Sequence, residues 1–173
     1  MDTSILQPCD FILFSGKSFI SRGIKFFSKS KWSHIVIYVG GGSNYIIEAT
    51  AAGVEKNELV PLLKHADAIA VVRIPGLTVE NSELMKAKAY SMLGDKYDFW
   101  QLITFSAYFS LRKIGIICPW IIGDKAGEVV CSALCAICTM VIPLKFAKTV
   151  KQVSPQTIYE SDKVCVVFEQ EIK

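Results

Sequence analysis

The sequence lacks most of the features that assign a chain to a class at once. Its longest stretches without charge, 99–111 and 129–144, fall short of the roughly 20 apolar residues that a membrane-spanning helix needs. Its 19 basic and 16 acidic side chains nearly balance, so charge does not indicate a nucleic-acid partner. No repeat, linker or low-complexity segment divides it. The 173 residues therefore predict one ordinary domain covering 1–173.

The N-terminus also lacks the basic start and unbroken apolar core of a secretory signal, because Asp2 and Asp10 flank it and Pro8 interrupts it. We therefore expect a cytoplasmic protein. In a reducing compartment the six cysteines should be thiols rather than a disulfide framework. With 51% hydrophobic residues the chain is apolar for a soluble protein, so lipid or a partner surface is worth considering. The pattern does not indicate an oligomeric state.

Three of the cysteines, Cys131, Cys135 and Cys138, stand within eight residues of each other in an apolar run. On a helix they share one face, but the outer two lie about 10 Å apart along the axis, too far for one zinc ion to bind all three. Only two histidines are present, so we expect no metal site. Cys135 and Cys138 are interpreted as small hydrophobic residues. Cys131 differs, because the N–H groups and dipole at a helix start stabilise a thiolate.

Periodicity and turn residues predict the secondary structure. The segment 34–50 contains two β-rich runs separated by glycine, serine and asparagine, which indicates an antiparallel hairpin. A helix should follow near residue 80, with Asn81 or Ser82 as its N-cap and Gly94 as its stop. The other expected elements are strands at 10–14, 68–75 and 163–170, an amphipathic helix within 15–32 and a buried helix at 131–140.

The helix expected within 15–32 interleaves basic side chains with Phe26 and Phe27. This pattern suits a solvated helix face, and it also suits peripheral contact with an anionic membrane. The basic residues concerned are Lys17, Arg22, Lys25, Lys29 and Lys31.

His34 begins the first strand of the expected hairpin, and Glu48 lies in the second. If the turn centres on Gly41 or Gly42, the two side chains face each other directly or diagonally and share one face of the sheet. A carboxylate beside an imidazole orients the ring of a cysteine hydrolase and stabilises its protonated form. The alternative is that His34 only caps a strand and Glu48 is solvated. The residues alone leave both interpretations open.

Five segments in order complete the pattern: the run from "DFILF" to "SHIVIYVGG", then "IIEAT", "MLGDKYDF", "EVVCSAL" and "VSPQTIY". This order resembles the circularly permuted branch of the NlpC-type papain-like cysteine hydrolases. That branch includes YiiX-like proteins, a group of poxvirus proteins and, more distantly, the lecithin retinol acyltransferase group. The resemblance spans nearly the whole chain.

The resemblance implies an α+β, papain-like fold in which the helix carrying the nucleophile packs on an antiparallel sheet. It makes Cys131 the nucleophile, His34 the base and Glu48 the orienting residue, and it places Tyr97 near the oxyanion site. No cofactor is implied. The expected reaction is hydrolysis, or acyl transfer, of an amide or ester in a peptide, a cell-wall peptide, or a lipid or N-acyl substrate.

The segment 99–127 departs from this pattern, because it is longer and more apolar than a compact enzyme of this type requires. It could line an acyl pocket or extend the core. A catalytically silent acyl- or lipid-binding module of the same fold is the main alternative function, and a structural protein whose cysteines only pack is another. The presence of Cys131, His34 and Glu48 together argues against the silent module, and a profile of thiol reactivity would separate both alternatives from an enzyme.

Overall fold

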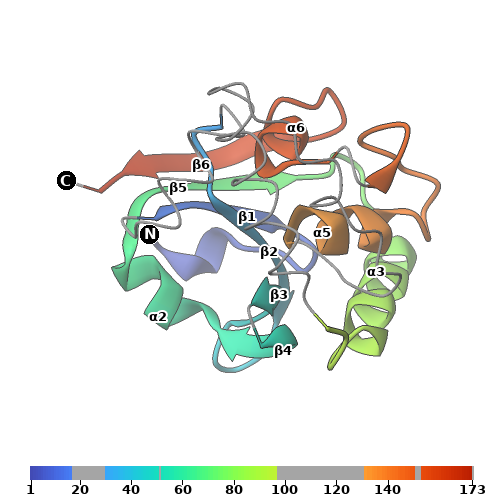
Figure 1. Cartoon of the computed structure of the whole chain (residues 1–173), viewed down its shortest axis with the longest axis horizontal. Coiled ribbons are helices and arrows are strands. Elements are labelled where there is room, and N and C mark those ends of the chain that lie inside the picture. The colour runs from blue at the N-terminus through green and yellow to red at the C-terminus, as the bar shows by residue number, and fades with distance from the viewer. Residues whose placement is uncertain (17–29, 51, 97–130, 151–152, 173) are drawn as a thin grey trace, which may run out of the picture.

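The centre of the molecule is an antiparallel sheet. The computed structural model describes residues 1–16, 30–50, 52–96, 131–150 and 153–172, and six strands in these ranges form one sheet (Figure 1). The strands are β1 Phe11–Gly16, β2 His34–Gly40, β3 Tyr45–Thr50, β4 Gly53–Glu58, β5 Ala66–Arg73 and β6 Cys165–Glu171. Their order across the sheet is β4-β3-β2-β1-β5-β6, so the chain returns to the other side of β1 after β4.

Apolar layers cover both faces of this sheet. Strand alternation directs Leu13 and Ile37 to one face, beneath α3, α5 and α6, and Ile12 and Val36 to the other, beneath α2 and the N-terminal turn η1. Figure 1 shows α3 and α5 beside each other, with α2 on the opposite side of the sheet. The bounds are η1 Thr3–Ile5, α2 Leu59–Lys64, α3 Val79–Ser91, α5 Cys131–Thr139 and α6 Pro155–Tyr159. Double coverage explains why the central strands are apolar without interruption.

The strongest local predictions are confirmed. The hairpin expected at 34–50 is β2 and β3, paired with Ile37 opposite Ile47. The buried helix expected at 131–140 is α5, and the strands expected at 68–75 and 163–170 are β5 and β6. Each of these segments has a clear hydrophobic pattern, and the hairpin and β5 also have glycine or proline at a turn.

The predicted N-cap of α3 is wrong. Thr78 caps this helix by accepting a hydrogen bond from the backbone N–H of Asn81, so the helix begins at Val79 instead of after Asn81 or Ser82. The Pro75-Gly76 turn ends the preceding segment early, which leaves Thr78 as the first residue with a capping side chain. Val79 is 81% exposed, so the first turn of α3 is not buried.

The segment "GVEKNE" was not predicted as a strand, but it forms β4 at the edge of the sheet. Its polar side chains alternate between half-buried and exposed positions, a pattern that resembles a loop in the sequence. The short helix α2 follows directly and packs on the sheet through Leu59.

Two expectations lie outside the described residues. The basic helix expected within 15–32 falls mostly on 17–29, and the apolar segment 99–127 falls within 97–130. In the ranges that the structure does describe, no helix combines the length and apolar character needed to cross a membrane.

A buried ion pair connects the N-terminal segment to the sheet. Asp10 is 1% exposed, and both of its carboxylate oxygens accept hydrogen bonds of 2.7 Å from Arg73 on β5. The carboxylate also accepts a bond from the backbone N–H of Gln7, and Arg73 donates to the carbonyl of Ile5. A paired geometry of this kind offsets the cost of burying the carboxylate.

We expect Asp10→Ala to lower the free energy of unfolding by about 3 kcal/mol, because it leaves the Arg73 guanidinium without its partner. Urea unfolding followed by tryptophan fluorescence measures the change. Glu83→Gln is the control: it breaks the exposed pair with Lys86 and should cost under about 0.5 kcal/mol. Equal losses in the two variants would contradict the structural role given to Asp10.

Candidate active site

The register of β2 and β3 brings His34 and Glu48 together. Because Ile37 lies opposite Ile47, His34 and Glu48 are diagonal neighbours on the same face. A hydrogen bond of 2.6 Å joins Nε2 of His34 to Oε2 of Glu48. The Glu48 side chain is only 6% exposed, whereas that of His34 is 27% exposed. The buried carboxylate therefore fixes a ring that remains partly accessible.

Asn57 on β4 holds the other oxygen of the same carboxylate. Its Nδ2 donates a hydrogen bond of 3.0 Å to Oε1 of Glu48. Both oxygens of Glu48 thus have a partner, which a buried carboxylate requires. Asn57 was not among the predicted site residues, because the sequence pattern of β4 does not indicate a strand. Alternation from Glu48 across a third strand would have been the only signal.

Cys131 is the first residue of α5, and α5 packs against β2 and β3. In the ladder that the structure describes, the pairing of β2 with β3 stops at Ile37 and Ile47. The backbone N–H groups of Ile35, two residues from Ile37, and of Ser132 face the Cys131 sulfur closely enough to lower its pKa. The sulfur therefore lies where the two strands separate.

At this point the Cys131 thiol lies beside the side chain of His34, close enough for the two groups to shift each other's pKa. Nε2 of the ring contacts Glu48, so Nδ1 is the nitrogen left for the sulfur. The structure thus brings together Cys131, His34 and Glu48 in a row with the imidazole in the middle. Tyr97, expected near the oxyanion site, lies outside the described residues.

The pKa values of the three groups are shifted by burial and by each other. Burial alone would lower the pKa of His34, but hydrogen bonds and charges from Cys131 and Glu48 outweigh it and raise the pKa to about 10. Burial would raise the pKa of Cys131, yet the hydrogen bond and charge of His34, with the two backbone N–H groups, lower it. Near neutral pH these directions favour a thiolate beside an imidazolium.

The pKa of Glu48 is lowered for the same reason. Burial opposes ionisation, but the hydrogen bond and charge of His34 and the hydrogen bond from Asn57 outweigh it. The carboxylate is therefore charged when the ring is charged. A row of thiolate, imidazolium and carboxylate is what nucleophilic catalysis by cysteine needs.

Two serines that match the family pattern have structural contacts here. Ser132 Oγ donates a hydrogen bond of 2.7 Å to the carbonyl of Val153, which ties the chain after α5 to the start of that helix. Ser33 Oγ donates to the carbonyl of Phe14 and accepts from the N–H of Gly16. Both contacts fix backbone next to a site residue.

The remaining cysteines of α5 differ from Cys131. Cys135 and Cys138 are fully buried in the core. Burial raises the pKa of Cys135, and it raises the pKa of Cys138 to about 12. Both thiols are therefore neutral packing groups.

The same residues do not make a metal site. His34 lies between Glu48 and Cys131, so the three side chains form a row and do not converge on one point. Across the described part of the chain, no group of three or more histidine, cysteine, aspartate or glutamate side chains is placed to hold a metal ion.

Comparisons with known proteins give the context of this site. Residues 10–110 match a family described as permuted papain-like amidase enzymes, YaeF/YiiX. The probable lipoprotein peptidase YaeF of Escherichia coli (strain K12) is 31% identical over 115 residues, which are 66% of this chain. Those residues are 41% of YaeF, so the chain spans about two fifths of that relative.

The crystal structure of metalloprotein yiiX from Escherichia coli O157:H7 has the same fold. It matches with a TM-score of 0.60 at 20% identity, over 96% of this chain and 98% of that one. The expected α+β, permuted papain-like fold is confirmed. The family match includes His34, Glu48 and Asn57 and ends before Cys131, whose place in the site rests on the geometry above. Because this match covers more than half of the residues, the chain belongs to the permuted papain-like amidase family of YaeF and YiiX.

Proposed function

We propose that the protein is a cysteine hydrolase that cleaves an amide bond through a Cys131–His34–Glu48 triad. The observation that supports this most is the position of the His34 ring, which is hydrogen-bonded to the buried carboxylate of Glu48 and lies beside the thiol of Cys131, whose pKa it lowers. A histidine that only caps a strand has no need of a thiol partner at a helix start.

In the first half of the reaction the Cys131 proton resides on His34, and the thiolate attacks the carbonyl carbon of the substrate. Negative charge develops on the carbonyl oxygen, and backbone N–H groups at the start of α5 can donate hydrogen bonds to it. His34 then gives its proton to the leaving nitrogen, the carbon–nitrogen bond breaks, and the amine departs. A thioester between Cys131 and the acyl group remains.

In the second half a water molecule replaces the amine. His34 takes a proton from the water, the oxygen attacks the thioester carbon, and the carbon–sulfur bond breaks to release a carboxylate and return the thiolate. Glu48 stays ionised throughout, and it stabilises the imidazolium in both halves.

The family description and the relative's name support an amide or peptide substrate. Ester hydrolysis and transfer of the acyl group to an amine use the same thioester and differ in the leaving group or the acceptor. Amide hydrolysis is the version proposed here.

Replacing Cys131 with alanine should abolish amide hydrolysis, because no other described thiol lies beside an imidazole. The assay is release of an amine from a panel of acyl-amide and peptide substrates. Wild-type protein quenched during turnover should show by intact mass an acyl adduct that is absent from Cys131→Ala. Cys135→Ala is the matched control on the same helix and should keep the adduct. A Cys131→Ala variant that hydrolyses amides at the wild-type rate would end the proposal.

The pKa of Cys131 can be measured without a substrate. Since this pKa is lowered, labelling by iodoacetamide should reach half its maximal rate below pH 8.5, the ordinary range of a thiol. His34→Ala removes the two largest causes of the lowering. The midpoint should then move upward by at least about one pH unit, and labelling at pH 7 should fall about tenfold.

Peptide mass analysis resolves the cysteines in the same experiment. Cys165 is exposed and should label in the native protein, at a rate that ignores His34→Ala. Cys135 and Cys138 should label only after unfolding, because they are buried with raised pKa values. If the pH midpoint for labelling of Cys131 does not change in His34→Ala, the ion pair between the Cys131 thiolate and the His34 imidazolium is contradicted.

Asn57 should act as a positioning residue through Glu48. Asn57→Ala removes the donor that orients the Glu48 carboxylate. The carboxylate can then turn away from Nε2, so the hydrogen bond that His34 donates to it weakens and the pKa of His34 should fall. Histidine NMR titration measures this directly, because the chain has only two histidines and His65 serves as the internal reference. We also expect kcat to fall while KM is unchanged. Glu58→Gln in the same strand is the control and should alter neither quantity.

A further inference from the structure

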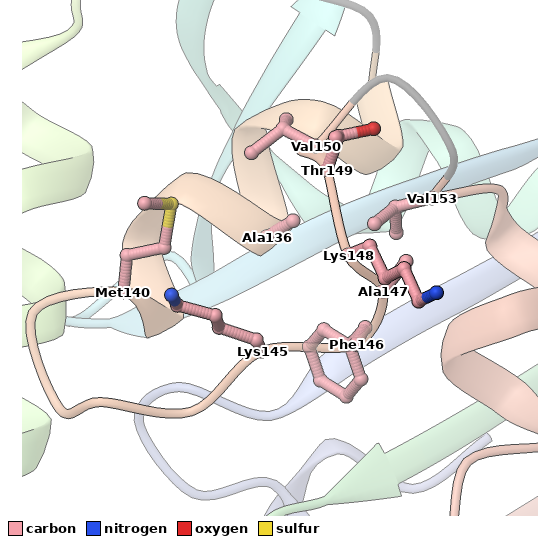
Figure 2. Close-up of a pocket in the computed structure, with 9 residues that line it drawn as sticks. All are labelled: Ala136, Met140, Lys145, Phe146, Ala147, Lys148, Thr149, Val150 and Val153. Carbon is pink, nitrogen blue, oxygen red and sulfur yellow. The ribbon is translucent and has the colours of Figure 1, made fainter.

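A small apolar pocket lies beside α5, further along the helix from Cys131. It has a volume of about 130 Å³. Figure 2 shows its wall built from α5 and from the chain that follows it. The lining residues are Ala136, Met140, Lys145, Phe146, Ala147, Lys148, Thr149, Val150 and Val153. Nothing in the triad mechanism uses this pocket.

The wall of the pocket is fixed to the core. The ring of Phe146 packs edge-on against that of Phe11, a fully buried residue of β1, at 6.1 Å between centroids. Val153 is held by the hydrogen bond from Ser132, next to Cys131. A preformed apolar cavity near 150 Å³ binds a molecule of about six carbon atoms. This pocket is therefore of a size for a short aliphatic chain or one apolar side chain.

The charge around the pocket has one sign. Lys145 and Lys148 line it, and no lining residue is acidic. The Lys163 ammonium donates to the backbone carbonyl of Lys145, which brings a third cation near the rim. Within the described residues neither Lys145 nor Lys148 forms an ion pair. Figure 2 shows the Lys145 side chain extending toward Met140.

We propose that this pocket binds an apolar chain of about six carbons that carries a carboxylate, with the chain against Ala136 and Phe146 and the carboxylate at Lys145. Apolar walls with cations alone at the rim favour an anionic amphiphile over a neutral or cationic one. Neither Cys131 nor His34 lines the pocket, so we propose it as a binding site beside the triad.

Binding does not need chemistry at Cys131, so the test separates this proposal from the proposed hydrolysis. The protein is Cys131→Ala, labelled with ¹³C at the methionine methyl groups. Met140 lines the pocket and is 49% exposed, whereas Met85 and Met92 are buried in the core. Titration with hexanoate should shift the Met140 resonance in a saturable way and leave those of Met85 and Met92 in place.

The charge is tested with two probes of equal chain length. Hexan-1-ol should bind at least about threefold more weakly than hexanoate, and hexylamine more weakly still, because its ammonium meets the lysines. Lys145→Gln should weaken hexanoate binding about threefold and leave hexan-1-ol unchanged. Lys64→Gln, on α2 at the opposite face, is the control and should change neither. Both substitutions are at surface lysines and should preserve folding.

Three results would overturn the proposal. The first is a Met140 resonance that hexanoate does not shift in a saturable way. The second is equal binding of the acid, alcohol and amine, which would leave only an apolar hollow. The third is a shift with vesicles of phosphatidylglycerol but not with hexanoate, which would make this face a membrane contact instead.

Discussion

The site depends on the hydrogen bond between His34 and Glu48. A carboxylate that is 6% exposed is stable only if its oxygens have partners, and His34 and Asn57 supply one each. The register of β2 against β3 and of β3 against β4 therefore sets the position of the ring. Where β2 and β3 separate, the backbone N–H of Ile35 faces the sulfur of Cys131 and helps to lower its pKa. The separation of two strands thus creates the place for the thiol.

The position of Cys131 depends on how α5 packs against the sheet. α5 is apolar all round, and eight of its nine residues are buried, so packing alone fixes its axis on the sheet. Its first residue, Cys131, then lies where β2 and β3 separate, with its thiol beside the imidazole of His34. Cys135 and Cys138 sit deeper in the same layer and contribute only volume. Position along the helix therefore decides the charge of each thiol. Cys135 and Cys138 are neutral inside the core, and Cys131 is charged beside His34.

The contact between His34 and Glu48 could be predicted from the sequence because a hairpin with a glycine-rich turn permits few registers. Either allowed register puts the two side chains on one face. The apolar run that follows Cys131 also predicted a helix that begins at this residue. Its pairing with His34 came from the family resemblance, since no local pattern states which segments meet across a fold. Tyr97 stays a prediction.

The residue that supports Glu48 could not be predicted from the sequence. β4 is an edge strand of polar residues, and its pattern resembles a loop, so Asn57 could not be placed beside Glu48. The pocket beside α5 was equally hidden. Its walls join a helix to an irregular segment without hydrophobic periodicity, so the packing of Phe146 on Phe11 could not be predicted.

The order of the site residues along the chain has a consequence for biosynthesis. His34, Glu48 and Asn57 all lie on β2 to β4, which leave the ribosome before α5 is made. A nascent chain that has formed this sheet holds the base and its support but has no nucleophile. The reactive thiol follows with α5, after strands β1 to β5 have been made and before β6. The order of the chain thus places the nucleophile later in synthesis than its base.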